Sequence, residues 1–272
     1  IVPTLGRFKI KEFVDLIVDL TYWDLNQFDK YEIIIVFNTI TKCEMYYKIK
    51  EIFEGISEIR VIHQPLRGIC HALNEGIKNA NYKYICRQDD DDISLPLRIY
   101  ETYKYLIENN LDVAFCRADV YTQSKVKKWR KRPIGSDKTS IYFFNPYIHA
   151  TMVTKRETLI ESKGYILHDG PEDHFLFYTL IRKDYKLGIL DKTLYKYLIK
   201  NSERGSGLQR AISNYRRQMI LISRIFWSEK LTLGEMVLCL AGALYNTCVI
   251  ILKVVWHILS KFKTPFKRIS KK

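Results

Sequence analysis

The stretch Gly68–Arg98, "GICHALNEGIKNANYKYICRQDDDDISLPLR", decides the fold. Its first part, Ile69–Ala80, predicts a helix that starts directly after Gly68. A short strand follows at Tyr82–Arg87 ("YKYICR"), and a second helix is expected from Pro96 to about Glu108, because proline suits the first turn of a helix. Four aspartates, Asp89–Asp92, lie between this strand and the second helix. The order helix, strand, helix indicates an α/β fold.

The same alternation continues on both sides of this stretch. The run "YEIIIVF" is continuous, apolar and rich in β-branched residues, which is typical of a strand covered on both faces in a parallel sheet. The other expected strands are Ile59–His63, Leu111–Tyr121, His149–Arg156 and Lys186–Leu198, and the other expected helices are Lys9–Leu20 and Pro171–Lys183. We expect a basic loop at Ser124–Pro133 and a small-residue linker at Asn201–Gly207. The fold class is therefore α/β, with a mostly parallel sheet flanked by helices.

Composition and charge divide the chain in two. Its 272 residues, 47% of them hydrophobic, are enough for one fair-sized core with an appendage, and a charged content of 27% does not suit a disordered chain. From Arg204 onward the chain has 13 Lys/Arg and 2 Asp/Glu, a net charge of +11, whereas the first 203 residues carry only +3. The basic charge is confined to the tail and no nucleic-acid-binding module accompanies it, so no nucleic acid partner is expected.

Cysteine usage and the start of the chain add two expectations. The six cysteines form no CxxC pair, which predicts small buried side chains in a reducing compartment and no zinc site. No signal-peptide pattern is found, and we expect the first strand, at "IVPTLGR", to be cut short at its start.

The aspartate cluster allows two interpretations. In an extended segment, side chains at i and i+2 point the same way, so Asp89 and Asp91 would share one face. Two carboxylates on one side, at the carboxyl end of a strand, suit a hard divalent cation such as Mg²⁺. The alternative is a solvated acidic turn in which Asp92 or Ser94 caps the next helix.

A second acidic pair, Glu172 and Asp173, lies in the first turn of the helix expected at Pro171–Lys183. Acidic side chains there interact favourably with the helix dipole, typically by about 0.3–1 kcal/mol. The dipole alone is a sufficient reason for the pair, so spacing does not assign it a catalytic role.

The order of the motifs along the chain is more informative about the function than any single motif. The chain has "PTLGR" from Pro3, "EIIIVFNT" from Glu32, the long stretch from Gly68, "HATMVTKRETLIESKGY" from His149 and "EDHFLFYTLIR" from Glu172. Over residues 1 to about 200 this order resembles the bacterial, inverting glycosyltransferases of family 2, whose fold is GT-A. The resemblance implies a GT-A (Rossmann-like) catalytic domain at residues 1–203. It also implies sugar transfer from a nucleotide sugar to a glycan or lipid-linked acceptor, in surface polysaccharide or lipopolysaccharide biosynthesis.

The resemblance also implies roles for individual residues. Asp89 and Asp91 match the two acids of the family's DxD motif, so Asp91 is expected to bind Mn²⁺ or Mg²⁺ together with Asp89. The expected nucleotide-binding residues are Pro3, Thr4, Asn38, Asp89 and Asp90; Asp173 is the expected general base, and Glu172 and His149 are expected in the acceptor site. A buried structural role for His149 is an equal alternative. A UDP-sugar is the expected donor, although Phe37-Asn38 stands where the family usually has two acids, one of which commonly recognises uracil.

The tail, residues 204–272, contains the 17-residue apolar run Met236–Leu252. As a helix this run is about 25 Å long, shorter than the roughly 30 Å hydrocarbon core of a bilayer. Basic residues flank it on both sides, against the positive-inside tendency for a single span. We expect a helical, membrane-associating tail that lies in the cytoplasmic leaflet of the inner (plasma) membrane. A true span and a helical subdomain packed on protein are the alternatives.

Two rivals to glycosyl transfer remain at this point. A nucleotidyltransferase-like enzyme also uses a cation and a nucleotide, but "PTLGRFK" is a poor version of the phosphate loop that such an enzyme needs. The other rival is a non-catalytic, membrane-bound scaffold with a degenerate GT-A site.

Overall fold

The computed structural model describes residues 1–122, 125–128, 139–166, 170–199, 207–228 and 231–262. The chain forms two compact units. The first contains residues 1–138 and 146–199, and the second contains residues 139–145 and 200–272. The predicted domain boundary at residue 203 stays a prediction.

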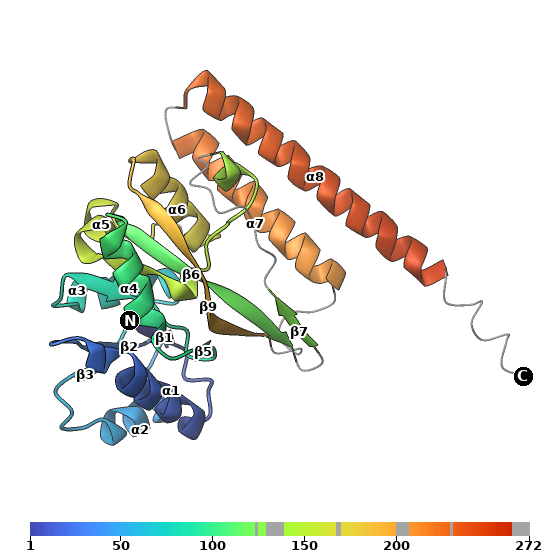
Figure 1. The fold of residues 1–272 in the computed structure, drawn as a ribbon. Helices are drawn as coiled ribbons and strands as arrows, with labels where there is room; N and C mark the ends of the chain where they lie inside the picture. Colours follow the sequence, from blue (N-terminus) through green and yellow to red (C-terminus); the bar gives the residue numbers. More distant parts are fainter. Residues whose placement is uncertain (123–124, 129–138, 167–169, 200–206, 229–230, 263–272) are drawn as a thin grey trace, which may run out of the picture. The chain divides into compact units, whose positions relative to one another are not determined.

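A three-stranded parallel sheet opens the first unit (Figure 1). Its order is β1 (Val2–Thr4), β2 (Ile33–Phe37), β3 (Ile59–His63). All five residues of β2 are buried, as expected for a strand covered on both faces. Helices α1 (Ile10–Trp23) and α2 (Glu44–Ile52) pack through their apolar side chains on one face, and α3 packs on the other. The carboxyl ends of the three strands therefore share one edge of the sheet.

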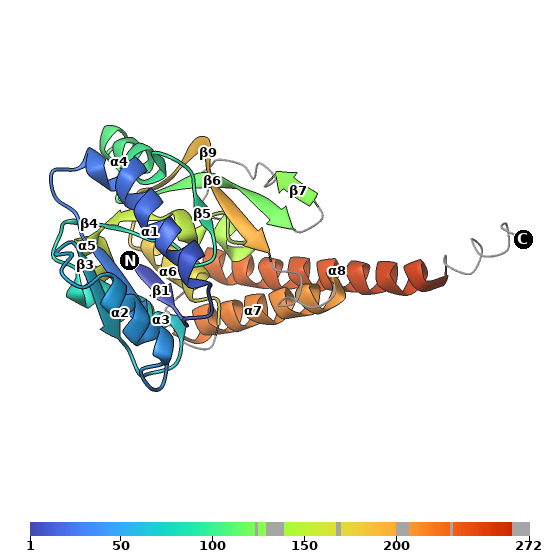
Figure 2. The same cartoon turned by 90° about the horizontal axis from the view of Figure 1, so that it is seen from below.

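The second sheet of this unit is mixed. Its strands are β4 (Tyr84–Cys86), β5 (Ile93–Ser94), β6 (Val113–Thr122), β7 (Lys125–Lys128), β8 (Val153–Lys155) and β9 (Leu187–Ile199), in the order β4-β8-β6-β9-β5 with β7 paired to β6. Only β6 and β9 pair in parallel; the long β6–β9 ribbon is visible in Figures 1 and 2. The remaining helices of the unit are α3 (Ile69–Asn79), α4 (Arg98–Glu108), α5 (Arg156–Glu161) and α6 (Glu172–Arg182). The α/β prediction is confirmed, with parallel pairing throughout the first sheet and antiparallel pairs in the second.

Several local features differ from the prediction, among them strand β5 and helix α5, which were not predicted, and Gly207, which was expected in the linker but begins α7. Lys125–Lys128 was expected in a loop but forms β7, because its backbone pairs with the end of β6. His149–Thr151 was expected in a strand but forms a 3-10 turn, and the strand begins only at Val153. Helix α2 was not predicted. The rest of the predicted basic loop, residues 129–133, and of the predicted linker, residues 201–206, lies outside the described residues.

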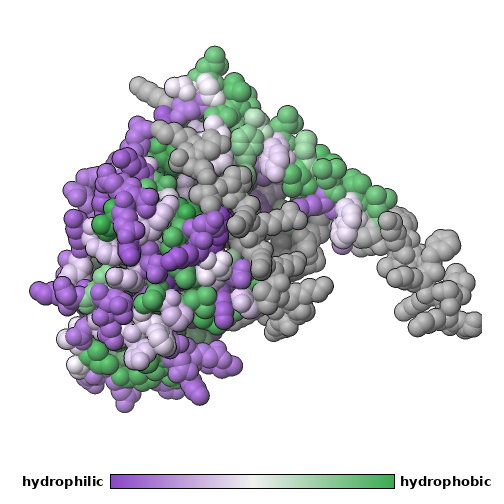
Figure 3. Space-filling view, in the orientation of Figure 1, coloured by the Kyte–Doolittle hydropathy of each residue, from purple (hydrophilic) through white to green (hydrophobic). Residues whose placement is uncertain are grey.

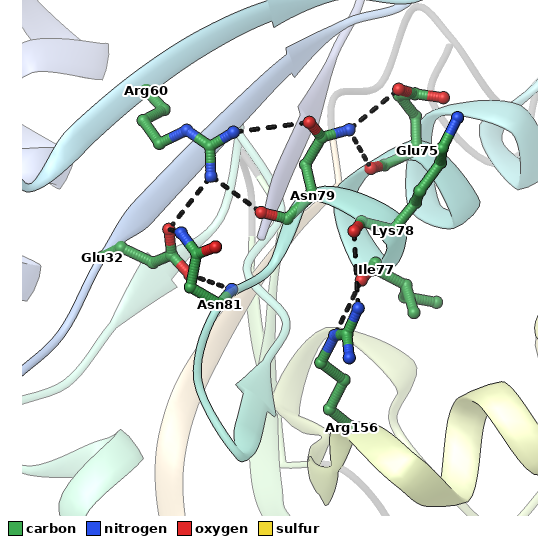
Figure 4. Close-up of polar contacts among 8 residues, drawn as sticks. All are labelled: Glu32, Arg60, Glu75, Ile77, Lys78, Asn79, Asn81 and Arg156. Atoms are coloured by element: carbon green, nitrogen blue, oxygen red, sulfur yellow. Dashed lines mark hydrogen bonds and ion pairs between the residues drawn. The ribbon is translucent and has the colours of Figure 1, made fainter.

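Polar contacts hold the carboxyl end of α3 against the first sheet (Figure 4). Arg60 NH1 on β3 donates to the carbonyl of Asn79, at 2.7 Å, and to Glu32, at 3.3 Å. Glu32 also accepts from the backbone and side chain of Asn81. Arg156 donates to the two carbonyls that precede Asn79. These side chains satisfy the last carbonyls of the helix, which have no partner within it, and so fix the position of α3.

The second unit is built on two long helices, α7 (Gly207–Ser228) and α8 (Leu233–Phe262), which lie side by side (Figures 1 and 2). The segment 139–145 packs with them: Gln218 Nε2 donates to the carbonyl of Tyr142, at 3.1 Å, and Asn246 Nδ2 to that of Phe143, at 3.3 Å. Within α8, Leu233–Leu259 is long and apolar enough to cross a membrane by length and composition, with a mean hydropathy of 2.0.

Candidate active site

The four aspartates follow β4, but they do not continue it as an extended segment. Asp90 and Asp91 form a turn, so the expected alternation of faces is wrong. The Asp89 carboxylate pairs with Arg87 at 2.7 Å, and Asp90 accepts a hydrogen bond from Thr4 Oγ1. Asp92 accepts from a backbone N–H of β9 at 2.7 Å. The cluster is therefore tolerated because these carboxylates are directed to different partners.

A buried arginine holds the acid turn in place. Arg98, with 0% of its surface exposed, donates to the side chain of Gln88 at 2.8 Å and to the carbonyl of Arg87 at 3.1 Å. Gln88 in turn donates to the carbonyl of Asp89 at 2.8 Å. The guanidinium of Arg98 also lies over the ring of Tyr195. Sequence reasoning gave Arg98, Gln88 and Tyr195 no role, although Arg98 ends the motif "SLPLR".

The acid cluster does not cap the next helix. Helix α4 begins at Arg98, and its first N–H groups donate instead to Asp24 Oδ1, at 2.7 Å from Ile99 and 3.1 Å from Tyr100. The alternative interpretation, with Asp92 or Ser94 as the cap, is wrong. Asp92 is 4% exposed, and burial together with the neighbouring Asp89 charge raises its pKa to about 8.

Asp89 and Asp91 are the two carboxylates that the sequence predicts as ligands for a cation. Asp91 lies on the turn, partly exposed, two residues beyond Asp89. Within the part of the chain that the structure describes, no three His, Cys, Asp or Glu side chains are grouped as a metal site. Mg²⁺ and similar hard cations are often held by one or two carboxylates plus substrate phosphates and water. Asp91 with Asp89 fits that kind of site, in which the substrate supplies further ligands.

The predicted nucleotide residues at the end of β1 reach the acid turn. Thr4 Oγ1 donates to Asp90 and accepts from the N–H of Gly6 at 2.8 Å. Pro3 pairs with Val36 in the parallel register of β1 and β2. The structure therefore brings Thr4, at the end of β1, into contact with the acid turn, and Pro3 directly precedes it.

Asn38 follows β2, and its side chain makes hydrogen bonds that hold a neighbouring loop. Its Nδ2 donates to the carbonyls of Gln64 and Leu66, at 3.2 and 2.5 Å, and its Oδ1 accepts from the N–H of Gly68 at 2.9 Å. The preceding Phe37 is buried in the core. Asn38 thus ties the loop 64–68 to β2, and its role in nucleotide binding stays a prediction.

The second acidic pair starts α6, as predicted: Glu172 and Asp173 are in its first turn. His149 lies nearby, buried, with Nε2 2.6 Å from the Tyr165 hydroxyl and its ring against Phe177 of α6. Burial, with the positive charge of Arg87, lowers the pKa of His149 well below its ordinary value. His149 is therefore neutral and hydrogen-bonded in the interior, and its role in the acceptor site stays a prediction.

Electrostatics place the two acidic groups in one neighbourhood. Burial raises the pKa of Tyr165, and the charges of Asp173 and Glu172 raise it further while Arg87 opposes them. Burial acts to lower the pKa of Arg87, but Asp89 and, more weakly, Glu172 hold it above its ordinary value. Arg87 therefore lies within the electrostatic range of both acidic groups, and Tyr165 lies within that of Glu172 and Asp173. Sequence reasoning missed both residues.

Tyr165 is held by α3. Asn74 Nδ2 donates to the carbonyl of Tyr165 at 2.8 Å, and Asn74 Oδ1 accepts from its N–H at 2.9 Å. The preceding Gly164 has φ +63°, and a Cβ added there would lie 2.4 Å from Asn74 Oδ1. Only glycine fits this approach without strain.

An apolar cavity of about 290 Å³ lies between β2 and β4, away from the acidic pair of α6. Its walls are mostly aliphatic and aromatic, among them Val2, Ile33, Ile85 and Tyr103. Arg87 and Gln88 also line it, so the cavity borders the acid turn, although its mostly apolar walls offer little to a charged diphosphate.

Known proteins share this architecture. The "O-antigen biosynthesis glycosyltransferase WbnJ" of Escherichia coli is 25% identical over 198 residues, 71% of this chain and 77% of its own. A structure of S. aureus TarS 1-349 in complex with UDP-GlcNAc has a TM-score of 0.57 at 17% identity and covers 90% of this chain and 70% of its own. The mannosyltransferase PcManGT from Pyrobaculum calidifontis, in complex with GDP-Man and Mn²⁺, has a TM-score of 0.62 at 14% identity and covers 99% and 81%.

The fold is GT-A, as its structural neighbours show. Residues 1–167, more than half of the chain and including β1, the acid turn and His149, match the sequence profile described as "Glycosyl transferase family 2". The chain belongs to glycosyl transferase family 2.

Proposed function

We propose that this glycosyltransferase works by inversion, depends on a divalent cation, and moves a sugar from a UDP-sugar to a glycan or lipid-linked acceptor in surface polysaccharide biosynthesis. The observation that carries the proposal is that Arg87, which pairs with Asp89 of the acid turn, also lies within the electrostatic range of Glu172 in the first turn of α6. The relative named for O-antigen biosynthesis and the structures with bound nucleotide sugars support the reaction class.

In this proposal Asp173 accepts the proton of the attacking hydroxyl. The hydroxyl oxygen forms a bond to the anomeric carbon on the face opposite the diphosphate, the bond from that carbon to the diphosphate oxygen breaks, and the configuration inverts. Proton transfer to a positioned base typically contributes about 10²–10⁴-fold. Asp91 and Asp89 would hold Mn²⁺ or Mg²⁺, which neutralises charge on the leaving diphosphate when bound.

The buried pair His149–Tyr165 is not the base. Tyr165 stays protonated because its pKa is raised, and His149 already shares a hydrogen bond with it. We assign this pair to holding the floor of the acceptor site beside Glu172. Asp173, in the first turn of α6, remains as the proton acceptor.

We further propose that the second unit brings the enzyme to the cytoplasmic face of the inner membrane. Support comes from the exposed apolar side chains of α8 and from the net charge of +11 after residue 203. Basic residues near anionic lipid contribute about 1 kcal/mol each to binding.

The test uses the full chain and two isosteric variants. A thermal-shift panel of UDP, GDP, CDP and dTDP with Mn²⁺ identifies the base, because a bound ligand stabilises the folded state. Donor hydrolysis and transfer are then measured for wild type, Asp91→Asn and Asp173→Asn, with Asp15→Asn on the exposed face of α1 as the matched control.

We expect Asp91→Asn to lose the Mn²⁺-dependent nucleotide shift. We expect Asp173→Asn to keep that shift while its turnover falls by about 10²–10⁴-fold. The product formed by the wild type should show an inverted configuration at the anomeric carbon. Unchanged turnover in Asp173→Asn would rule out this base. Release of pyrophosphate from an added nucleoside triphosphate would indicate a nucleotidyltransferase, and no shift with any nucleotide would indicate a scaffold.

A further inference from the structure

Helix α8 exposes one apolar stripe along its length. Exposed side chains recur every three or four residues, the spacing of one helix face: Val237, Leu240, Leu244, Cys248, Ile251, Val255 and Leu259. Leu244 is 66% exposed, and the nearby Trp256 is 71% exposed. Figure 3 shows this edge of the unit as a hydrophobic band. Lys253 is the one Lys or Arg between Leu233 and Leu259.

The polar residues of α8 do not interrupt the stripe. Asn246 donates to the carbonyls of Phe143 and Gly242, and Thr247 donates to that of Ala243 and lies 3.4 Å from the Tyr215 hydroxyl. These two residues, which break the apolar run in the sequence, therefore face the interior of the unit. The stripe itself therefore remains apolar, and the exposed Lys253 is not one of its residues.

The opposite side of α8 is occupied by α7, which runs antiparallel to it. Tyr215 of α7 meets Thr247, and seven residues later Ile222 approaches Gly242. Three exposed arginines of α7 occupy this same region: Arg216, Arg217 and Arg224. They therefore lie beside the middle of the apolar segment Leu233–Leu259.

This placement decides between crossing a membrane and lying on it. If α8 crossed with α7 still packed on it, the three arginines would enter the hydrocarbon core, where charged side chains are strongly disfavoured. If the hairpin lies flat, the stripe enters the lipid and the arginines stay at the level of the headgroups and water. Interfacial helices combine an apolar face with a basic polar face in this way.

We propose that α8 lies parallel to an anionic phospholipid surface, with the stripe from Val237 to Leu259 in the acyl boundary, and does not cross the bilayer. A second copy of the chain is a poorer occupant of the stripe, since two tails of +11 repel each other whereas anionic lipid attracts them. The inference rests on the proposed membrane association and is independent of glycosyl transfer.

The depth of Cys248 tests the orientation. Of the six cysteines, all within the described residues, it alone is exposed, and it lies near the middle of Leu233–Leu259. A maleimide fluorophore on Cys248 is mixed with phosphatidylcholine vesicles with and without phosphatidylglycerol, carrying quenchers at a shallow or a deep acyl position. We expect binding to the anionic vesicles and stronger quenching from the shallow position. Cys248→Ser, labelled in parallel, gives the background.

Two variants test the stripe itself. Leu240→Glu and Leu244→Glu are each expected to weaken vesicle binding by about tenfold or more, since each removes a lipid-facing leucine. Val18→Glu, at an exposed apolar position on α1, is the matched control and should bind as wild type does. Unfolding curves confirm that each variant is folded.

The outcomes separate the claims. Stronger deep quenching would overturn the flat orientation alone. No vesicle binding by wild type would overturn membrane association as well, whereas glycosyl transfer is judged by the separate turnover assay. Vesicle binding that is unchanged in both glutamate variants, or a dimer that both variants dissociate, would overturn the stripe as a lipid surface.

Discussion

The substitution Asn38→Asp introduces an acid where the family pattern has one. It therefore tests whether residue 38 recognises the nucleotide base or holds the loop 64–68 in place. In the structure the amide of Asn38 donates two hydrogen bonds, to the carbonyls of Gln64 and Leu66, and accepts one from Gly68. Aspartate keeps the acceptor but loses both donors, and its second oxygen faces two carbonyl oxygens. We expect a loss of stability and a looser loop 64–68.

The magnitude follows from the two lost donors. Each hydrogen bond contributes about 0.5–1.5 kcal/mol net, so the first unit should lose about 1–3 kcal/mol. For a unit of this size each kcal/mol lowers the Tm by about 2–4 °C, which gives a fall of about 5 °C. The variant should also raise the KM for the donor severalfold, because a loose loop must be ordered when the nucleotide binds.

The loss of stability in Asn38→Asp should depend on pH. Burial and the two carbonyls would raise the pKa of the new carboxyl in the folded protein above its ordinary value of about 3.9. While protonated, this carboxyl still has one donor, so the penalty is small at low pH and grows as pH rises through the raised pKa. The difference in Tm from wild type should therefore be larger at about pH 8 than at about pH 5, as differential scanning fluorimetry would show.

The control is Asn38→Ala, which loses all three bonds without adding a charge. Its Tm difference from wild type should be nearly the same at both pH values. Tighter UDP binding by Asn38→Asp with an unchanged Tm would refute the reasoning, because it would mean that position 38 contacts the base directly.

Four further outcomes are expected. Asp92→Asn should gain stability over wild type as pH rises from about 4 to about 8, by up to about 1.4 kcal/mol per pH unit, and the gain should level off above pH 8, because only the unfolded wild type releases this proton below the folded-state pKa; the measurement is urea unfolding across pH without metal. Asp24→Ala should lose about 1–2 kcal/mol in the same assay, since two N–H groups of α4 lose their acceptor, whereas Asp24→Asn should lose less. Gly164→Ala should lower the Tm by several degrees more than Gly55→Ala, because both have positive φ but only Gly164 has Asn74 in the way. EDTA should abolish turnover, and Mn²⁺ should restore it, without a change in the Tm of the nucleotide-free protein.

Each of these has a contrary result. A stability of Asp92→Asn that follows the wild-type pH curve would mean that Asp92 is ionised in the fold. Equal losses for Asp24→Ala and Asp24→Asn would place the cap elsewhere, and equal losses for the two glycine variants would remove the role of Asn74. Full turnover in EDTA would exclude a required cation.

The sequence predicted the elements whose pattern is local. The run that became β2 is apolar on both faces, and the spacing in Ile10–Trp23 exposes one face and buries Phe13 and Ile17. Helix α2 was missed because it buries only Tyr46 and Ile49, so its apolar pattern is weak. Strand β7 was missed because backbone pairing decides it, and its lysines predict a loop.

In the candidate site, too, the sequence predicted the residues that belong to local motifs and missed those that the fold brings in from distant positions. Asp173, Asp91 and Thr4 were identified from motifs, and the structure places them in the same unit; their roles stay predictions. The groups that hold them come from distant positions: Asp24 lies about 75 residues before the helix it caps. Tyr195 lies about 105 residues beyond the turn it contacts. Local spacing contains no information about such pairs, so only the fold reveals them.

The partners of the four aspartates lower the net negative charge that an approaching ligand meets at the acid turn. Of four formal negative charges, that of Asp89 is offset by Arg87, and Asp92 is mostly neutral at pH 7 because its pKa is about 8. The electrostatic field at the acid turn is then closer to that of two carboxylates than of four. A nucleoside diphosphate can therefore approach without strong repulsion, and its rate of capture should vary only modestly with ionic strength.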